Sequence, residues 1–215
     1  HVRSMSVDAM QEVIADAAAT GAALHIVHVN SMSLAALPLV LDLIDAAHKR
    51  GMDITTEAYP YTAASTLLES TMFDEGWQQR LGISHGELQW VKTGERLTKE
   101  TFEKYRKETG QVIMHFMKAE WIDRAMASPF VMVASDGMPF APGAHPRSAG
   151  TFSRVLGYYV RERKALGLMD AIGKMTIMPA RRLEAIAPAM KNKGRIQVGA
   201  DADITVFDAA KVKDM

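Results

Sequence analysis

The apolar positions of the chain follow two alternating periods, which predict helices and strands in turn. Over residues 6–20 they recur every three or four positions, with Ser6 placed to cap a helix and Gly21 to end it. A short strand is predicted over residues 23–29, a helix over 33–50 and a second strand over 53–58. Helices of a dozen residues between short apolar strands are typical of parallel βα units.

The middle of the chain interrupts this alternation. Residues 69–110 contain two tryptophans within a dense pattern of charges, which predicts an inserted helical or irregular segment. The alternation resumes with a strand over residues 111–117, a helix over 119–127 and a strand over 130–135 that ends at Asp136.

The last third predicts two helices and then a short β element. The helices cover residues 150–166 and 168–187, after a loop rich in proline and glycine. Over residues 193–207 a period of two, seen at Ile204 and Val206, indicates strand. About four strands precede this element, whereas a complete (β/α)8 barrel needs about 250 residues. The α/β pattern therefore predicts either half of a barrel or a smaller sheet of another design.

Composition narrows the classes of partner. With 25 basic and 25 acidic residues the net charge is +0, so no overall field favours nucleic acid or an anionic membrane, and a small-molecule substrate is expected. No apolar run of about twenty residues is evident in the sequence. The absence of cysteine fits a cytoplasmic location, which we expect, although many secreted proteins share it.

Three residues carry side chains that can bind a metal. His28 closes the first predicted strand, Asp136 follows the strand over residues 130–135, and His1, the first residue given, precedes the first predicted helix. In a parallel sheet the carboxyl ends of strands share one edge, where zinc can take imidazole and carboxylate ligands. Taken singly, His28 also fits a structural strand histidine and Asp136 fits the cap of a turn at Gly137.

Five further strings of sequence, taken in order, resemble one family. They are His1-Val2-Arg3-Ser4, His25-Ile26-Val27-His28-Val29-Asn30, Glu57-Ala58-Tyr59-Pro60-Tyr61-Thr62-Ala63-Ala64-Ser65-Thr66, Ala134-Ser135-Asp136-Gly137 and His145-Pro146-Arg147-Ser148-Ala149-Gly150-Thr151-Phe152. Together they are similar to the second half of the N-acyl-D-amino-acid deacylase (D-aminoacylase) branch of the amidohydrolase superfamily. The tail over residues 193–208 is similar to the closing signature of that superfamily.

The resemblance implies a fold and a domain organisation. Residues 1–190 would be strands 5–8 of a TIM-like (β/α)8 metal-dependent hydrolase barrel, with the insertion around 69–110. Residues 191–215 would begin a small β domain.

The resemblance also implies the chemistry of the site. His1 and His28 would bind one or two zinc ions, and Asp136 would both touch metal and transfer the proton during hydrolysis of the amide. Tyr59 and Ser65 would contact substrate, and Arg147 would grip the α-carboxylate of an N-acyl amino acid. Without the resemblance these three fit a buried aromatic, a turn serine and a solvated loop arginine.

The predicted activity is deacylation of N-acyl-D-amino acids by a zinc-dependent amidohydrolase. The family's remaining ligands would lie before His1, so we expect the 215 residues alone to be inactive without the missing N-terminal half of the barrel. Two alternatives stay open. One is a cyclic amidase similar to hydantoinase or dihydroorotase, and the other is a non-catalytic half-barrel whose open sheet edges pair with a partner chain or a second copy.

Overall fold

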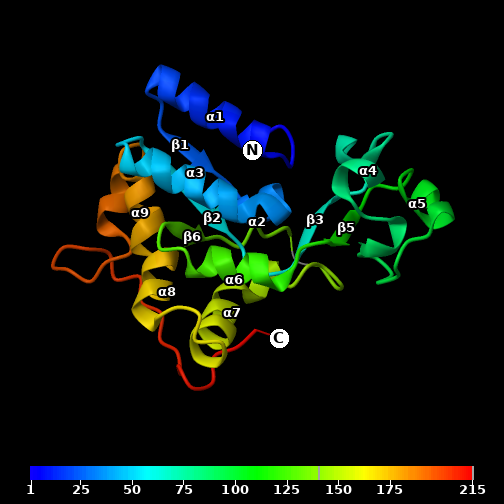
Figure 1. Cartoon of the computed structure of the whole chain (residues 1–215). Coiled ribbons are helices and arrows are strands. Elements are labelled where there is room, and N and C mark those ends of the chain that lie inside the picture. The colour runs from blue at the N-terminus through cyan, green and yellow to red at the C-terminus, as the bar shows by residue number, and fades with distance from the viewer. Residues whose placement is uncertain (140, 215) are drawn as a thin grey trace.

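Two three-stranded sheets organise the chain. The computed structural model, drawn in Figure 1, describes residues 1–139 and 141–214. One sheet is parallel in the order β1-β2-β6, and the other is antiparallel in the order β3-β5-β4. The strands are β1 (Leu24–Ile26), β2 (Ile54–Ala58), β3 (Ala63–Leu67), β4 (Leu88–Trp90), β5 (Gln111–His115) and β6 (Val131–Val133).

Helices connect the strands of the parallel sheet and cover its outer face. The α-helices are α1 (Val7–Thr20), α2 (Val29–Ser33), α3 (Leu37–Lys49), α4 (Trp77–Leu81), α5 (Lys99–Tyr105), α6 (Ala119–Ala127), α7 (Arg147–Arg154), α8 (Leu168–Met175) and α9 (Ile177–Leu183). A π-helical stretch, η4 (Val155–Glu162), continues α7. Short 3₁₀ turns are η1 (Leu34–Ala36), η2 (Thr71–Phe73), η3 (His85–Glu87) and η5 (Pro188–Asn192). Helix α1 packs on β1, α3 on β2 and α8 on β6, as in the outer ring of a barrel.

Local sequence explains the first βα unit as predicted. The Ser6 hydroxyl accepts a hydrogen bond from the Ala9 amide, and Gly21 ends α1 with a φ of 70°. In α3 the residues Leu37, Val40 and Ile44 recur at helical spacing and are buried. The unit therefore forms from local signals that agree with its packing.

One helical stretch passes a length and hydropathy test for a membrane span. It covers residues Val29–Lys49, and half of its most apolar window is buried within this fold. The apolar stripe of α3 faces the parallel sheet and joins the main hydrophobic core. We therefore interpret this stretch, which was not anticipated from the sequence, as a core helix.

The strand predicted over residues 111–117 exists, but its assignment to the parallel barrel was wrong. Ile113 of β5 lies opposite Ser65 of β3 and Gln89 of β4, both in antiparallel pairs. A short apolar run such as Val112–Met114 is compatible with either kind of sheet, and only its partners decide. The parallel sheet consequently has three strands among the described residues, and the antiparallel unit spans residues 63–115. In Figure 1 this unit, with α4 and α5, projects from one side of the parallel sheet.

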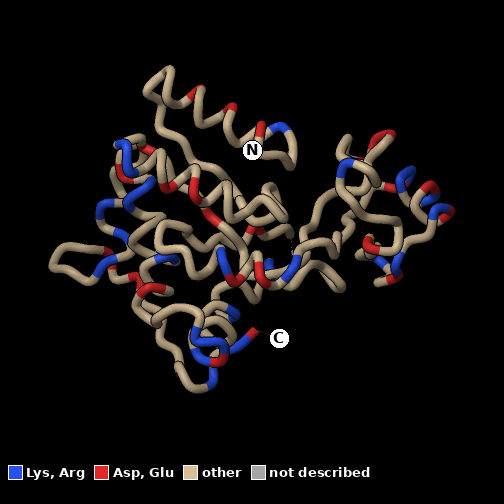
Figure 2. Tube along the Cα trace, in the orientation of Figure 1, with Lys and Arg blue, Asp and Glu red and all other residues tan. Residues whose placement is uncertain are grey.

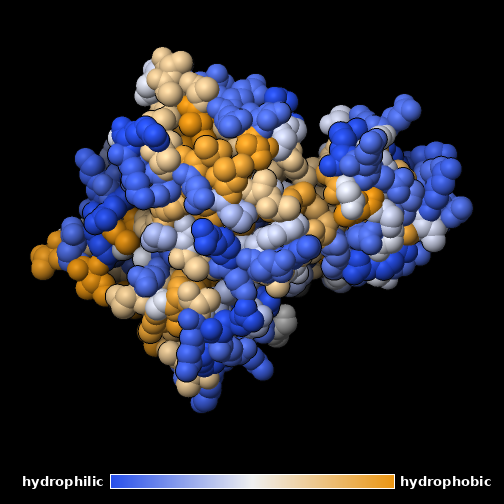
Figure 3. Space-filling view, in the orientation of Figure 1, coloured by the Kyte–Doolittle hydropathy of each residue, from blue (hydrophilic) through white to orange (hydrophobic). Residues whose placement is uncertain are grey.

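The prediction of strand over residues 193–207 was also wrong. No strand occurs in the described part of residues 191–214. Ile196 and Val198 are fully exposed, and the loop that carries them projects from the body, with apolar side chains at its tip in Figure 3. A period of two in the sequence is compatible with a strand that has one apolar and one polar face. A strand also needs a partner strand for its backbone hydrogen bonds, and none of the described residues pairs with this segment.

Charges are distributed without a single-signed face on the side seen in Figure 2. Basic and acidic residues lie interspersed over the lobe formed by α4 and α5. This agrees with 25 residues of each sign in the sequence.

His145 fastens the loop before α7 to the start of β3. Its Nε2 lies 2.9 Å from the Ala63 carbonyl oxygen, and its Nδ1 accepts a hydrogen bond from the Arg147 amide at 3.0 Å. These two bonds require the neutral ring, because protonation would place a second hydrogen against the Arg147 amide. Burial, followed by the charge of Arg147, lowers the pKa of His145 to about 4.

Replacing a core side chain of α3 should destabilise the protein far more than replacing an exposed one. Ile44 is 1% exposed and Leu39, on the same helix, is 52% exposed. We expect Ile44→Ala to lower the free energy of unfolding by about 2–4 kcal/mol and Leu39→Ala by less than about 1 kcal/mol, measured by urea denaturation. Equal losses in the two variants would contradict the packing of α3.

The His145 ring should make stability depend on pH in a defined window. Its folded pKa of about 4 lies below the ordinary value of 6.5, so its contribution is complete above pH 6.5 and is lost as the pH falls toward 4. We expect the stability advantage of the wild type over His145→Gln, which does not titrate, to shrink by about 3 kcal/mol between pH 7.5 and pH 4. Denaturant midpoints at both pH values for both proteins test this, and a constant difference would contradict it.

Candidate functional site

Two residues in strained backbone conformations stand at the carboxyl ends of parallel strands. His28 follows β1 with a φ of 34°, and Asp136 follows β6 with a φ of 47°. Positive φ costs a non-glycine residue about 1–3 kcal/mol, and such strain persists mostly where side chains are aimed for a function. The two strand ends lie at the same edge of the sheet, as predicted from sequence.

His28 and His1 face each other across this edge. Nε2 of His28 lies 3.0 Å from Nδ1 of His1, and the ring centroids are 4.6 Å apart. On its other side Nδ1 of His28 lies 3.3 Å from the Ser31 hydroxyl, which helps to fix the orientation of the ring. Burial lowers the pKa of His28, against the opposing effect of Asp136. The histidine is therefore neutral at pH 7, the form that can bind a metal.

Asp136 is oriented by a buried arginine. Nη2 of Arg147 lies 3.1 Å from Oδ2 of Asp136 and also donates to the Ser65 carbonyl oxygen at 3.2 Å. The Arg147 side chain is 2% exposed, whereas that of Asp136 is 33% exposed. The carboxylate thus has an anchored side and an open side.

Several buried polar atoms around Arg147 have no hydrogen-bond partner among the described residues. They include Nε and Nη1 of Arg147, the Tyr59 hydroxyl and the Ser65 hydroxyl. The guanidinium lies over the Tyr59 ring at 4.6 Å. Burial raises the pKa of Tyr59 to about 12, although the charge of Arg147 opposes this, so the phenol remains a donor at neutral pH. Buried donors left unsatisfied are costly, and an anionic ligand would satisfy them.

All of the site residues predicted from sequence line one cavity. Its volume is about 900 Å³, and its walls include His1, His28, Tyr59, Ser65, Asp136 and Arg147. The remaining wall comes partly from the antiparallel unit of residues 63–115, which we call the inserted unit, and includes Leu67, Met72 and Leu81. These three residues could not be predicted from the sequence, because apolar side chains in an irregular segment look the same whether they face a core or a cavity.

The three predicted metal ligands are not all brought together. Among residues 1–139 and 141–214, no three His, Asp or Glu side chains lie close enough to hold a metal ion. His1 and His28 converge, but Asp136 turns to Arg147 because a partly buried carboxylate is stabilised by the nearest cation. The prediction that all three surround one ion is therefore not met by this arrangement.

The histidine pair by itself fits part of a zinc site. Two nitrogen ligands at about 2.0–2.1 Å from a tetrahedral zinc lie about 3.4 Å apart. The observed spacing of 3.0 Å requires only a small separation of the two rings. A stable site needs further ligands beside these two histidines.

Asn30 lies close to the site in sequence but outside the cavity. It lies two residues after His28 but is fully buried, and its Nδ2 donates to the Tyr59 carbonyl oxygen at 3.2 Å. Asn30 therefore supports the backbone at Tyr59, directly after β2, and does not line the cavity.

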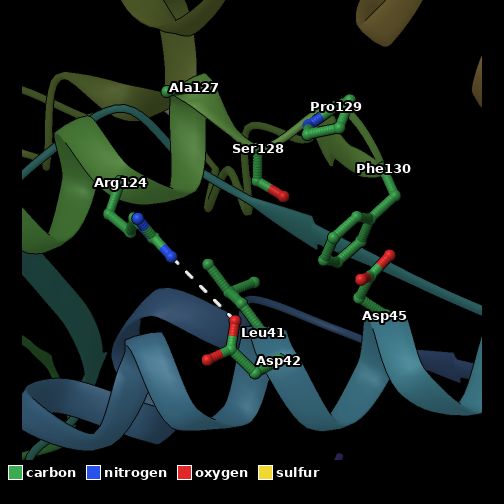
Figure 4. A pocket seen from close by; sticks show the side chains of 8 residues that line it. All are labelled: Leu41, Asp42, Asp45, Arg124, Ala127, Ser128, Pro129 and Phe130. Atoms are coloured by element: carbon green, nitrogen blue, oxygen red, sulfur yellow. Dashed lines mark ion pairs between the residues drawn. The ribbon is translucent and has the colours of Figure 1, made fainter.

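A second, smaller pocket lies outside the sheet between α3 and α6 (Figure 4). Its volume is about 280 Å³, and it is lined by Leu41, Asp42, Asp45, Arg124, Ala127, Ser128, Pro129 and Phe130. Among these lining residues one ion pair forms, between the exposed side chains of Arg124 and Asp42, with a nitrogen–oxygen distance of 3.9 Å. Such a pair contributes little and carries no chemistry.

The chain is similar to curated deacylases over part of their length. It is 34% identical over 215 residues to N-acyl-D-glutamate deacylase of Alcaligenes xylosoxydans xylosoxydans, covering 96% of this chain and 43% of that protein. It is 32% identical over 188 residues to D-aminoacylase of the same organism, covering 81% of this chain and 36% of that protein. The chain thus spans about two fifths of the relatives that it matches.

Solved structures agree in fold. An N-acyl-D-glutamate deacylase from Bordetella bronchiseptica, complexed with zinc and a phosphonate inhibitor, gives a TM-score of 0.81 at 29% identity. The match covers 100% of this chain and 47% of that one. A D-aminoacylase described as defining a novel subset of amidohydrolases gives 0.78 at 28% identity, with 100% and 46% covered. The α/β architecture is therefore that of part of an amidohydrolase (TIM-barrel) fold.

A family model described as the amidohydrolase family matches residues 6–215, nearly the whole chain. With the strained His28 and Asp136 at the carboxyl ends of parallel strands, this match shows that the chain belongs to the amidohydrolase family.

Proposed function

We propose that the full-length protein is a zinc-dependent hydrolase that deacylates N-acyl-D-amino acids to a carboxylate and a free D-amino acid. The observation that carries the proposal is the buried Arg147, whose unpartnered donors lie beside Asp136 in the cavity of the paired histidines. A guanidinium buried next to a catalytic carboxylate suits a substrate that bears its own carboxylate close to the bond to be cleaved.

His1 and His28 are the residues of this chain that would hold zinc, with the other ligands supplied by the rest of the protein. When bound, zinc would polarise the amide carbonyl and make the attacking water more acidic. Zinc and a binuclear metal centre are described for structural relatives, which supports this assignment. The neutral state of His28 and the orienting contact with Ser31 suit it to this role.

Asp136 would move the proton. In the reaction the oxygen of water bonds to the amide carbon, and the carbon–nitrogen bond breaks. Asp136 would accept a proton from the water and return it to the departing nitrogen, so that the amine leaves neutral. The contact with Arg147 orients the carboxylate from one side, while its exposed side stays available to the reacting atoms.

Arg147, Tyr59 and Ser65 would orient the substrate. Nε and Nη1 of Arg147 would donate to the α-carboxylate, and the protonated Tyr59 phenol would donate to a carboxylate or carbonyl oxygen. Apolar residues Leu67, Met72 and Leu81 of the inserted unit would face the less polar part of the ligand.

Removing the proton acceptor should slow turnover strongly and leave zinc in place. In the full-length zinc-loaded protein we expect Asp136→Asn to lower kcat for N-acyl-D-amino acids by about 10²–10⁴-fold, because general acid–base catalysis contributes that much. Zinc content, measured by elemental analysis, should be retained, because the two histidines and the other proposed ligands are unchanged.

The same assay tests the proposed function against its rivals. Wild-type protein should cleave N-acyl-D-amino acids faster than hydantoins. Preference for hydantoins would indicate a cyclic amidase, and a protein that holds no zinc and cleaves neither class would be non-catalytic.

Removing the guanidinium should weaken recognition of the carboxylate specifically. We expect Arg147→Met to lower kcat/KM for N-acyl-D-amino acids by about 10–100-fold, from the loss of hydrogen bonds to a charged group. For substrates whose α-carboxylate is replaced by a neutral amide, the kcat/KM of the variant should lie closer to that of the wild type. Arg124→Met, in the outer pocket, is the matched control and should leave both rates unchanged. An equal loss on charged and neutral substrates would show that Arg147 does not bind the carboxylate.

A further inference from the structure

The last described residues fold back onto α7 and its π-helical continuation η4. In Figure 1 this segment ends close to α7. Nη1 of Arg161 donates to the Ala209 and Val212 carbonyl oxygens, at 3.1 and 2.6 Å. These bonds fix the backbone of the segment, although most of its side chains face solvent.

Two glycines make room for this approach. A Cβ atom built on Gly157 would lie 2.5 Å from the Val212 carbonyl oxygen and 3.1 Å from the Lys213 Cα. A Cβ on Gly150 would lie 2.9 Å from that of Asp214 and 2.6 Å from the Tyr61 hydroxyl. Any side chain at either position would separate the segment from the helix.

Asp214 enters a polar site prepared by the body of the protein. Its Oδ2 accepts hydrogen bonds from the Tyr61 hydroxyl at 3.1 Å and from Nη1 of Arg154 at 3.0 Å. The Arg154 guanidinium also lies over the Tyr61 ring at 4.9 Å. The Asp214 side chain is 16% exposed, so water competes weakly for these bonds.

The partners of Asp214 connect it to the cavity by two short routes. Nε of Arg154 donates to the Pro60 carbonyl oxygen at 2.8 Å, and Pro60 directly follows Tyr59. The Tyr61 and His145 rings pack in a T-shaped arrangement, with their centroids 5.3 Å apart. Nδ1 of His145 in turn accepts a hydrogen bond from the Arg147 amide. One carboxylate thus supports the backbone of both proposed substrate-binding side chains.

We propose that residues 208–214 form a clasp, and that Asp214 and Arg154 are positioning residues that hold Tyr59 and Arg147 in their places in the cavity. Neither residue lines the cavity, so each acts through Pro60, Tyr61 and His145. The part of this inference that concerns catalysis depends on the proposed function, and the part that concerns the order of the Tyr59–Tyr61 segment does not.

Hydrogen exchange tests the clasp without relying on activity. In the full-length protein we expect Asp214→Ala to speed amide exchange about tenfold or more in peptides that cover residues 58–63, because the local opening becomes easier. Gly157→Ala should do the same while leaving every charge in place. Lys211→Ala, an exposed residue of the same segment, is the matched control and should exchange like wild type. Wild-type exchange in both Asp214→Ala and Gly157→Ala would overturn the clasp.

Kinetics separate this inference from the proposed function. Asp214→Ala should raise KM for N-acyl-D-amino acids about tenfold or more, with a smaller change in kcat, and Asp214→Asn, which keeps an oxygen acceptor for Tyr61, should recover part of the loss. If wild-type protein shows no deacylation, the proposed function fails, and the exchange experiment still decides the clasp. Deacylation by wild type with unchanged KM in Asp214→Ala would show that the segment does not position the site.

Discussion

The guanidinium of Arg147 is the group around which the site is organised. A cation that is 2% exposed must be compensated by its surroundings, and here it contacts the Asp136 carboxylate, the Ser65 carbonyl oxygen and the Tyr59 ring. These groups come from different parts of the chain, after β6, in β3 and after β2. The need to stabilise one buried charge therefore brings both sheets together at the carboxyl ends of the parallel strands.

This arrangement also explains why the inserted unit is part of the site. Ser65 belongs to β3, whose partner strand among the described residues is β5 of the same unit. Since β3 meets Arg147 through its backbone, the unit is fixed to the rim of the parallel sheet by a hydrogen bond that depends on no particular side chain in β3. The apolar residues that the unit adds to the cavity therefore line the same cavity as Arg147.

Local signals predicted the parts of the fold that depend on neighbours in sequence. Helix α1 has its cap and its terminal glycine, and His28 and Asp136 were found because each follows a short apolar strand. The antiparallel pairing of β5 was missed because its apolar run fits two kinds of sheet, and the expected terminal β element was wrong because a strand needs a partner that no local pattern supplies. The pairing of Asp136 with Arg147 and the contact of Asp214 with Tyr61, 153 positions apart, depend on tertiary structure alone.

The register of the antiparallel sheet has a consequence for how such a protein can change. Ala63 lies directly opposite His115, so the inserted unit leaves and rejoins the parallel framework at adjacent points. A segment with neighbouring ends can be lengthened, shortened or exchanged with little disturbance of the scaffold, because the loop-closure cost rises only slowly with length. The sequence and length of the unit that forms one wall of the cavity can therefore change, while the strand ends next to His28 and Asp136 keep their geometry.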